Sequence, residues 1–274
     1  AQPRATGKAI ALAGSMGVDL SRIIQRGIIR QADVRAFADR MVPKAAGENE
    51  PAAVAPPEDV RGRINPEFLA TIQAAESDFN ELPGDEKIRL YRKHGGIIGE
   101  RVTIGREAVI RAEAIVIGDE CEIGDRTTIQ AQTLIMGRGC LIGRDNDILC
   151  RHIRFGDMLF LVNRILIGQG GAFNPESRLE VGHSCLISSD CLINTAHQVL
   201  IGDRSCLSPH VSIYTHSHWQ NVLEGYRAVF APVMIGNDVW ITGNCLVTPG
   251  TVMEDGSQAL ANSVVSGHVP RRTV

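Results

Sequence analysis

The stretch VGHSCLISSDCLINTAHQV, residues 181–199, decides the fold. Its aliphatic residues recur at every sixth position, at Val181, Ile187, Ile193 and Val199. A period of six fits neither an α-helix nor an ordinary half-buried strand. It fits a short strand and a corner, repeated, in which each strand turns one aliphatic side chain inward. Hexapeptide repeats of this kind are typical of β-helical solenoids.

The same spacing extends on both sides of this stretch. It recurs at Ile98, Ile104 and Ile110, at Ile117, Ile123, Ile129 and Ile135, at Ile201, Leu207 and Ile213, and at Ile235, Ile241 and Val247. Glycine often follows the aliphatic residue, as at Gly118 and Gly202, where a small residue lets the chain turn. The sequence therefore predicts a mainly β fold, a parallel β-helix with three strands per coil, over residues 97–274. The repeat has no clear phase between about 148 and 178.

Composition narrows the function classes. The formal net charge of -3 argues against a nucleic-acid-binding protein. No run of eighteen apolar residues occurs, so no membrane span is expected, and no signal peptide is visible. The seven cysteines include no CxxC pair. We therefore expect them to be buried thiols in a protein of the reducing cytoplasm.

Four segments divide the chain. Residues 1–41 are predicted to form a small helical domain, and residues 42–64, rich in Pro, Ala and Glu, a semi-stiff linker. Residues 65–96 form a helical lead-in with two short helical patterns. Asn65 and Pro66 are expected to cap the first of them. The β-helix follows from residue 97.

The repeat breaks between Ile213 and Ile235, where the chain begins with YTHSHW, residues 214–219. A long loop on a regular solenoid is usually functional. Imidazoles within the prism would lack polar partners among the aliphatic stacks, whereas at the base of a loop they can face a cleft. His216 and His218 are therefore candidate functional residues.

The repeats, this loop and the segment IGNDVWITGNCLVTPGTVMEDGSQALANSVVSGHVP, residues 235–270, resemble the left-handed β-helix (hexapeptide-repeat) acyltransferases. Within them, the maltose and galactoside O-acetyltransferases are most similar, and the resemblance is strongest over residues 181–270. It implies transfer of an acyl group, most simply acetyl from acetyl-CoA, to a hydroxyl of a sugar or similar small acceptor. It also implies a homotrimer with each active site between neighbouring prisms.

The resemblance implies roles at the loop and at the acceptor pocket. Its loop-root histidine, the general base, matches His218 in the context Ile213-Tyr214-Thr215-His216-Ser217-His218. Trp219 replaces the family's usual proline in the pocket wall. His216 has no family counterpart and is expected either to line the pocket or to be exposed. Asp190 stands where the acceptor pocket of the family has an asparagine, and it is either an acceptor ligand or a solvent-facing residue.

The resemblance also implies a donor site. The backbone N–H at Gly243 matches the family's oxyanion donor, and Ala261 and Ser266 match positions that line the CoA groove. Gly267 replaces a frequent family lysine, so Arg271 and Arg272 are the expected phosphate ligands. The chemistry is consistent: a neutral imidazole that removes the hydroxyl proton contributes about 10²–10⁴ in rate, and a fixed donor stabilises the tetrahedral oxyanion.

Other functions remain open at this point. In one alternative acyl transfer, the acceptor is an amine instead of a hydroxyl. In another, the donor is an acyl-dihydrolipoyl thioester, which presupposes a lipoyl domain upstream. A non-catalytic binding platform is a further class. Some β-helix proteins are carbonic anhydrases with three histidines on zinc, and His183 precedes His218 by 35 residues. The histidine pair five residues apart that such a site needs is missing, so we expect no metal.

Residues 1–41 resemble the peripheral subunit-binding domain of 2-oxo acid dehydrogenase acyltransferases. The matching elements are Gly17-Val18-Asp19-Leu20, Ser21, and a second helix with Asp33-Val34. The segment holds seven basic and three acidic residues, a net charge of +4. This favours docking on an acidic protein partner, and the alternative is packing against the acidic β-helix.

Overall fold

The computed structural model describes residues 8, 61–168, 174–217 and 228–274. The chain divides into two compact units, Ala1–Val54 and Ala55–Val274. The predicted helical domain at 1–41, except Lys8, and nearly all of the predicted linker lie outside the described residues. The description below concerns the second unit.

Three helices open the described part of this unit: α3 (Pro66–Ala74), α4 (Glu76–Glu81) and α5 (Gly84–Lys93). The sequence predicted only two helices in this segment. Asn65 caps α3 as predicted, because its side-chain oxygen accepts the backbone N–H groups of Glu67 and Phe68 at 2.8 and 3.2 Å. The aromatic rings of Phe68, Phe79 and Tyr91 pack edge to face. This packing joins the helices into one hydrophobic cap.

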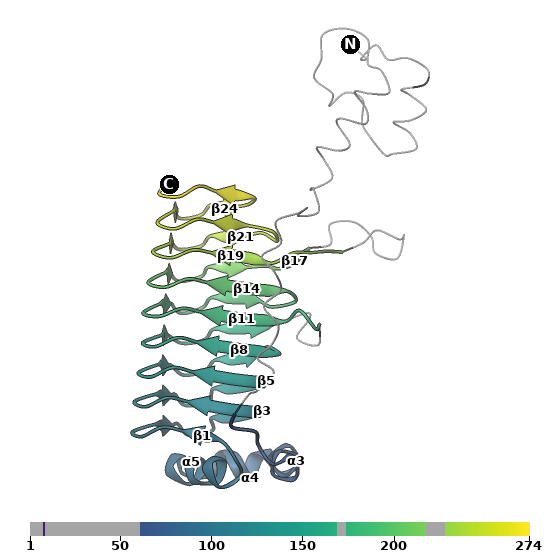
Figure 1. Cartoon of the computed structure of the whole chain (residues 1–274), viewed down its shortest axis with the longest axis vertical. Coiled ribbons are helices and arrows are strands. Elements are labelled where there is room, and N and C mark those ends of the chain that lie inside the picture. Colours follow the sequence, from purple (N-terminus) through teal and green to yellow (C-terminus); the bar gives the residue numbers. More distant parts are fainter. Residues whose placement is uncertain (1–7, 9–60, 169–173, 218–227) are drawn as a thin grey trace. The chain divides into compact units, whose positions relative to one another are not determined.

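Parallel strands then form a solenoid with three faces (Figure 1), so the predicted mainly β, parallel β-helical fold is confirmed. Face A contains β1 (Ile97–Ile98), the second halves of β3 (Val109–Ile117) and β5 (Thr128–Met136), β8 (His152–Phe155), β11 (Arg178–Val181), β14 (Gln198–Ile201), β19 (Val233–Ile235), β22 (Val252–Met253) and β25 (His268–Val269).

Face B contains β2 (Thr103–Ile104), β4 (Glu122–Ile123), β6 (Leu141–Ile142), β9 (Phe160–Leu161), β12 (Leu186–Ile187), β15 (Cys206–Leu207), β20 (Trp240–Ile241) and β23 (Gln258–Ala259). Face C contains the first halves of β3 and β5, then β7 (Asp147–Leu149), β10 (Leu166–Gly168), β13 (Leu192–Asn194), β16 (Ser212–Ile213), β21 (Leu246–Val247) and β24 (Val264–Val265). We call the three edges of the prism AB, BC and CA after the faces that they join.

The inward aliphatic positions stack as the period of six predicts, and Ile187, Ile193 and Val199 are at most 1% exposed. Ile135 is an exception, because Leu134 and Met136 are buried on either side of it while Ile135 is only half-buried. The prediction that Ile135 continues the stack is therefore wrong. The cause is an extra residue in this coil, since Ile117 pairs with Met136, 19 residues later.

Residues in excess of the six-residue period occur only on edge CA. Inward positions are always six apart from face A to face B, and again from B to C, as in Phe155, Leu161 and Ile167, which supplies the phase that the sequence left undefined. From one coil to the next, however, the paired residues lie 26 apart at Leu161↔Ile187 and 34 apart at Leu207↔Ile241. Edge CA thus carries every insertion of the described solenoid.

Crowding, more than turning, explains the glycines that follow the aliphatic positions. A Cβ added at Gly118 would lie 2.7 Å from the carbonyl carbon of Gly137 in the next coil, and one at Gly202 would lie 2.7 Å from that of Gly236. Neither glycine has a positive φ. The backbones of successive corners therefore stack too closely for any side chain at these positions.

The helical cap satisfies the open backbone groups of the first coil. The Tyr91 hydroxyl donates to the carbonyl of Ile110 and accepts its N–H, at 2.8 and 2.9 Å. The buried Lys87 ammonium donates to the carbonyls of Gly105 and Ala108 at 3.3 and 2.9 Å. Arg92 donates to the carbonyl of Ile98 at 3.0 Å.

The cysteines are free thiols, as predicted: six of the seven are buried, and Cys206 is half-buried. In the described segments, no helix is long and apolar enough to span a membrane.

Candidate functional site

Two insertions leave edge CA close together, one between β10 and β11 and one between β16 and β19. The second contains His218 and Trp219, which lie outside the described residues. Its two ends are described: β17 (His216–Ser217) leaves the prism and pairs antiparallel with the returning β18 (Val229–Phe230). The predicted general base therefore follows a two-stranded stem that is anchored on edge CA.

A buried amide, that of Asn194 in the coil below, organises the root of this stem. Its Oδ1 accepts the hydroxyl of Thr215 at 2.7 Å, the N–H of Ala196 at 3.2 Å and the ring Nδ1 of His216 at 3.0 Å. Its Nδ2 donates to the carbonyl of Gly168 at 3.1 Å, one further coil below. Asn194 is 1% exposed and Thr215 is fully buried. One side chain thus ties three successive coils together where the loop departs.

The hydrogen bond to Asn194 determines the tautomer of His216. An amide oxygen can only accept, so Nδ1 of His216 carries the proton, and Nε2 of the neutral ring is an acceptor. The ring also stacks on Phe230 across the stem, with 5.6 Å between ring centroids. His216 is half-buried. It is held in place by the stem, which favours pocket lining over plain exposure.

The four residues predicted to contact CoA lie on three different edges. Gly243 and Ala261 follow strands of face B in successive coils, so they lie on edge BC, where the carbonyl of Gly243 accepts the N–H of Asn262 at 3.1 Å. Ser266 follows β24 and lies on edge CA. Arg271 follows β25 and lies on edge AB, with its guanidinium on Asp255 at 2.9 Å. The four residues therefore do not form one continuous surface along a single edge of one prism.

Asp190 lies on edge BC, the edge of Gly243 and not the edge of His216. Its carboxylate receives two hydrogen bonds from Arg164 of the coil below, both at 2.8 Å. This guanidinium lowers the pKa of Asp190. Its backbone φ of +62° places it at the tip of a corner. The ion pair favours the solvent-facing alternative for Asp190, and its role as an acceptor ligand stays a prediction.

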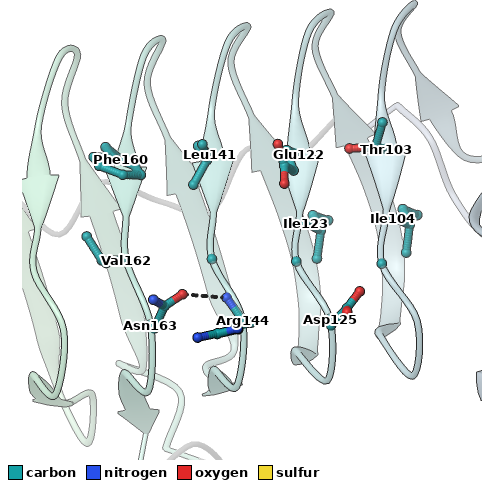
Figure 2. Close-up of a pocket in the computed structure, with 13 residues that line it drawn as sticks. Thr103, Ile104, Glu122, Ile123, Asp125, Leu141, Arg144, Phe160, Val162 and Asn163 are labelled. Carbon is teal, nitrogen blue, oxygen red and sulfur yellow. Dashed lines mark hydrogen bonds between the residues drawn. The ribbon is translucent and has the colours of Figure 1, made fainter.

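A shallow groove of about 550 Å³ on face B is a less suitable catalytic site. Figure 2 shows its outward row of Thr103, Glu122, Leu141 and Phe160 on successive strands. The polar side chains at its border serve the scaffold, because Asn163 accepts the backbone N–H of Arg144 at 2.8 Å. No histidine is among its described lining residues.

The histidine at 183, which an alternative zinc site would use, lies on edge AB, where its Nδ1 accepts the N–H of Asp157 at 3.0 Å. Within the described ranges, no group of three His, Cys, Asp or Glu side chains is close enough to hold a metal ion.

Sequence reasoning missed Asn194. A signal was present: an asparagine directly follows the inward Ile193, at a corner of the coil that precedes the long loop. The repeat alone, however, does not show that Asn194 and His216 meet, because 22 residues separate them. The repeat gives the coil length of 20 residues, between Ile193 and Ile213, but only the structure shows that Asn194 points toward the root of the loop.

Several curated proteins align with parts of this chain, whereas no protein-family model matches it. The chain is 26% identical to the galactoside O-acetyltransferase of Escherichia coli over 104 residues, which cover 37% of this chain and 51% of that protein. It is 29% identical to a putative lipopolysaccharide biosynthesis O-acetyl transferase of Escherichia coli over 144 residues, which cover 46% of this chain and 74% of that protein. The chain thus spans about half the length of the galactoside enzyme.

Among solved structures, a hexapeptide-repeat acetyltransferase of Vibrio cholerae complexed with acetyl coenzyme A aligns at 18% identity. The alignment covers 75% of this chain and 80% of that one, with a TM-score of 0.27.

Proposed function

We propose that this protein transfers an acyl group, most simply acetyl, from CoA to a hydroxyl of a sugar or related acceptor. The observation that carries the proposal is the stem on edge CA, which begins at a buried Asn194–Thr215–His216 network and leads directly to His218. The similarity to curated O-acetyltransferases supports the same reaction class.

In this mechanism the neutral imidazole of His218 takes the proton of the acceptor hydroxyl as its oxygen attacks the thioester carbonyl. The N–H of Gly243 stabilises the resulting oxyanion. Collapse of the tetrahedral intermediate forms the ester and expels the CoA sulfur, which takes the proton from the imidazolium. His216 and Trp219 would line the acceptor pocket, with His216 fixed in one tautomer by Asn194.

The donor side is compatible with the surface around Gly243. A Cβ added at Gly243 would approach only the carbonyl oxygen of Pro209, at 3.3 Å, so a thioester can come close to this backbone. Leu260 and Val264, beside Ala261, are 58% and 67% exposed and offer an apolar surface to the CoA arm. We therefore assign the donor to edge BC and leave Arg271, on the far edge AB, as its weakest predicted ligand.

The stem that precedes His218 and the proposed oxyanion donor, Gly243, belong to different edges of one prism, CA and BC. We propose that they meet between copies, with edge CA of one chain against edge BC of the next, in a closed cyclic trimer. Ser266, on edge CA, would then contact CoA held mainly by the neighbour. Asp190 would reach the same interface from the neighbour's edge BC.

A thiol-release assay with acetyl-CoA and a panel of sugar acceptors tests the reaction. His218→Ala should lower kcat by roughly 10²–10⁴ with the circular dichroism spectrum unchanged, while His216→Ala should cost far less. Equal losses in both variants would contradict the assignment of His218. Amine acceptors and an acyl-dihydrolipoamide donor in the same assay distinguish the two alternative chemistries.

Mixed oligomers test the shared site. Gly243→Pro removes the proposed oxyanion N–H, and His218→Ala removes the base. After co-refolding of the two inactive chains at equal amounts, about a quarter of the sites should be intact, because each intact site draws one residue from each chain. No recovery above the separate variants, with light scattering confirming mixed trimers, would mean that each chain holds a complete site.

Residues 1–41 are proposed to take no part in the chemistry and to dock on an acidic protein surface through their net charge of +4. Deleting them should leave acetyl transfer to a small acceptor nearly intact. Loss of most of that activity would instead make this segment part of the catalytic body.

A further inference from the structure

A second hollow lies on edge CA, beneath the two insertions. It is a cavity of about 260 Å³ between helix α3 and the first three coils. The lining contains Leu69 and Gln73 from α3, and Arg111, Gln130 and Leu149 from successive strands of face C. Glu113, Gln132 and Arg151 complete its polar part. The cavity lies on the same edge as the stem that leads to His218, and the proposed reaction does not use it.

The charges that line the cavity offset one another, which argues against an anionic ligand. The guanidinium of Arg111 is bonded to Glu76. The Nε of Arg151 donates to the side-chain oxygen of Gln132 at 2.9 Å. The carboxylate of Glu113 also lies in the lining and would repel an anion. Among the described lining residues, an anion would therefore meet one positive charge without an ion pair, that of Arg151, together with the negative charge of Glu113.

Polar groups without a protein partner, by contrast, are available to a neutral ligand. Among described residues, the side chains of Gln73, Gln130 and Glu113 have no hydrogen-bond partner, and the Nε of Arg111 has none either. An amide presents a donor and an acceptor, and a carboxylate presents two acceptors; vicinal hydroxyls can bond to both kinds of group. Leu69 and Leu149 add aliphatic surface for the C–H face of a ring. The volume lies below the roughly 300–1,000 Å³ of pockets for drug-sized ligands, so it suits a single small ring.

A continuous column of residues joins this cavity to the proposed acceptor site. Gly168 stacks on Leu149 so closely that an added Cβ would lie 2.4 Å from the Leu149 carbonyl oxygen. Asn194 bonds Gly168 from the coil above, and His216 bonds Asn194. Three strand spacings therefore separate Leu149 from the coil of His216, and four separate Gln130 from it, about 15–20 Å at 4.7–4.9 Å each. One sugar ring does not span this distance, but a short oligosaccharide does.

We infer that the cavity between α3 and edge CA is a second saccharide subsite, so that the acceptor is a neutral oligosaccharide acylated on a unit about 15–20 Å from the unit held here. Its position as an acceptor subsite rests on the proposed function. The saccharide binding itself does not, since it follows from the lining of the cavity.

Leu149→Trp tests the inference by filling the cavity, and Gln130→Ala tests it by removing one amide. Leu141→Trp is the matched control, because Leu141 belongs to the same coil and is also half-buried but points outward on face B. The probes are neutral di- to tetrasaccharides and their constituent monosaccharides. Calorimetry measures binding, and the thiol-release assay measures kcat/KM.

The wild type should favour at least one oligosaccharide over its monosaccharide by tenfold or more. Leu149→Trp should abolish this preference, and Gln130→Ala should reduce it severalfold. In both variants kcat/KM for the monosaccharide should stay within about twofold of the wild type. The control Leu141→Trp should stay within about twofold of the wild type on both classes of acceptor. Equal losses on both classes of acceptor, or no preference in the wild type, would overturn the subsite and leave acyl transfer intact. Oligosaccharide binding that Leu149→Trp removes, without acetyl transfer by any form, would support the subsite and overturn the proposed function.

Discussion

Replacing Asn194 by alanine is the most informative change at the loop root. The substitution removes the acceptor for the N–H of Ala196 and for Nδ1 of His216, and the donor to the carbonyl of Gly168. The N–H of Thr215 loses a long bond to the Asn194 side chain, at 3.4 Å. The Thr215 hydroxyl keeps two partners, because it donates to the main-chain carbonyl of Asn194 at 3.1 Å and accepts the N–H of His197 at 3.0 Å. The stem would therefore lose its tie to the coil below, whereas the aliphatic stack would stay in place.

The cost follows from which groups are left without partners. The Ala196 N–H is fully buried, and an orphaned buried group costs about 1–3 kcal/mol. His216 is only half-buried and can turn to water, so its loss adds about 1 kcal/mol or less. The carbonyl of Gly168 keeps the N–H of Thr195 at 3.3 Å. The total is about 1–4 kcal/mol, and activity should fall together with stability because His218 directly follows the stem in the chain.

Asn163→Ala is the matched control, since Asn163 makes one exposed hydrogen bond at the border of face B. It should cost about 1 kcal/mol or less and leave kcat/KM unchanged. Urea unfolding followed by circular dichroism, together with the acetyl-transfer assay, measures both effects. If Asn194→Ala is no less stable than Asn163→Ala and retains full activity, the buried amide does not hold the stem and this account of the site fails.

The remaining predictions concern the scaffold. Gly202→Ala should destabilise the protein by about 1–3 kcal/mol through overpacking. Gly267 has φ +73° and no atom within 4 Å of an added Cβ, so Gly267→Ala should cost only about 1–2 kcal/mol of backbone strain. Thermal unfolding should show the larger loss of stability for Gly202→Ala. Burial and the neighbouring arginines lower the pKa of His152, so the unfolded chain takes up this proton first as pH falls below about 6.5. Stability should then decline over that range, and His152→Gln should flatten the decline in urea titrations. Six of the seven cysteines are buried, and burial raises the pKa of Cys191 to about 11. At most one thiol per native chain should therefore react promptly with a thiol reagent at pH 8. All seven should react after denaturation.

The sequence predicted the solenoid well because its signal is local. Each inward aliphatic residue lies six positions from the next on two of the three edges, and a reader of the sequence can follow this without a structure. Ile135 shows the limit: one extra residue on edge CA shifts the phase, and the residues alone do not reveal on which edge it falls. The helical cap was also visible through Asn65 and Pro66, although α4 was not separated from α3.

The candidate site was less accessible to sequence reasoning. The loop and His216 were found because they interrupt the repeat. Asn194 was missed because its contacts depend on coil length. The distribution of Gly243, Ser266 and Arg271 over three edges depends on which face each preceding strand belongs to. Whether two residues of a solenoid meet is determined by the sum of all coil lengths between them, and a single misjudged insertion changes the answer.

The helical cap has a consequence for how this protein associates. An unpaired edge of a β-ladder is a template for the strands of other molecules and a route to fibres. Here Tyr91, Lys87 and Arg92 occupy backbone groups of the first coil that a foreign strand would need. End-to-end polymerisation through this coil is thereby blocked. Copies of the chain are left to meet through the sides of the prism, where assembly can close into a ring rather than grow without limit.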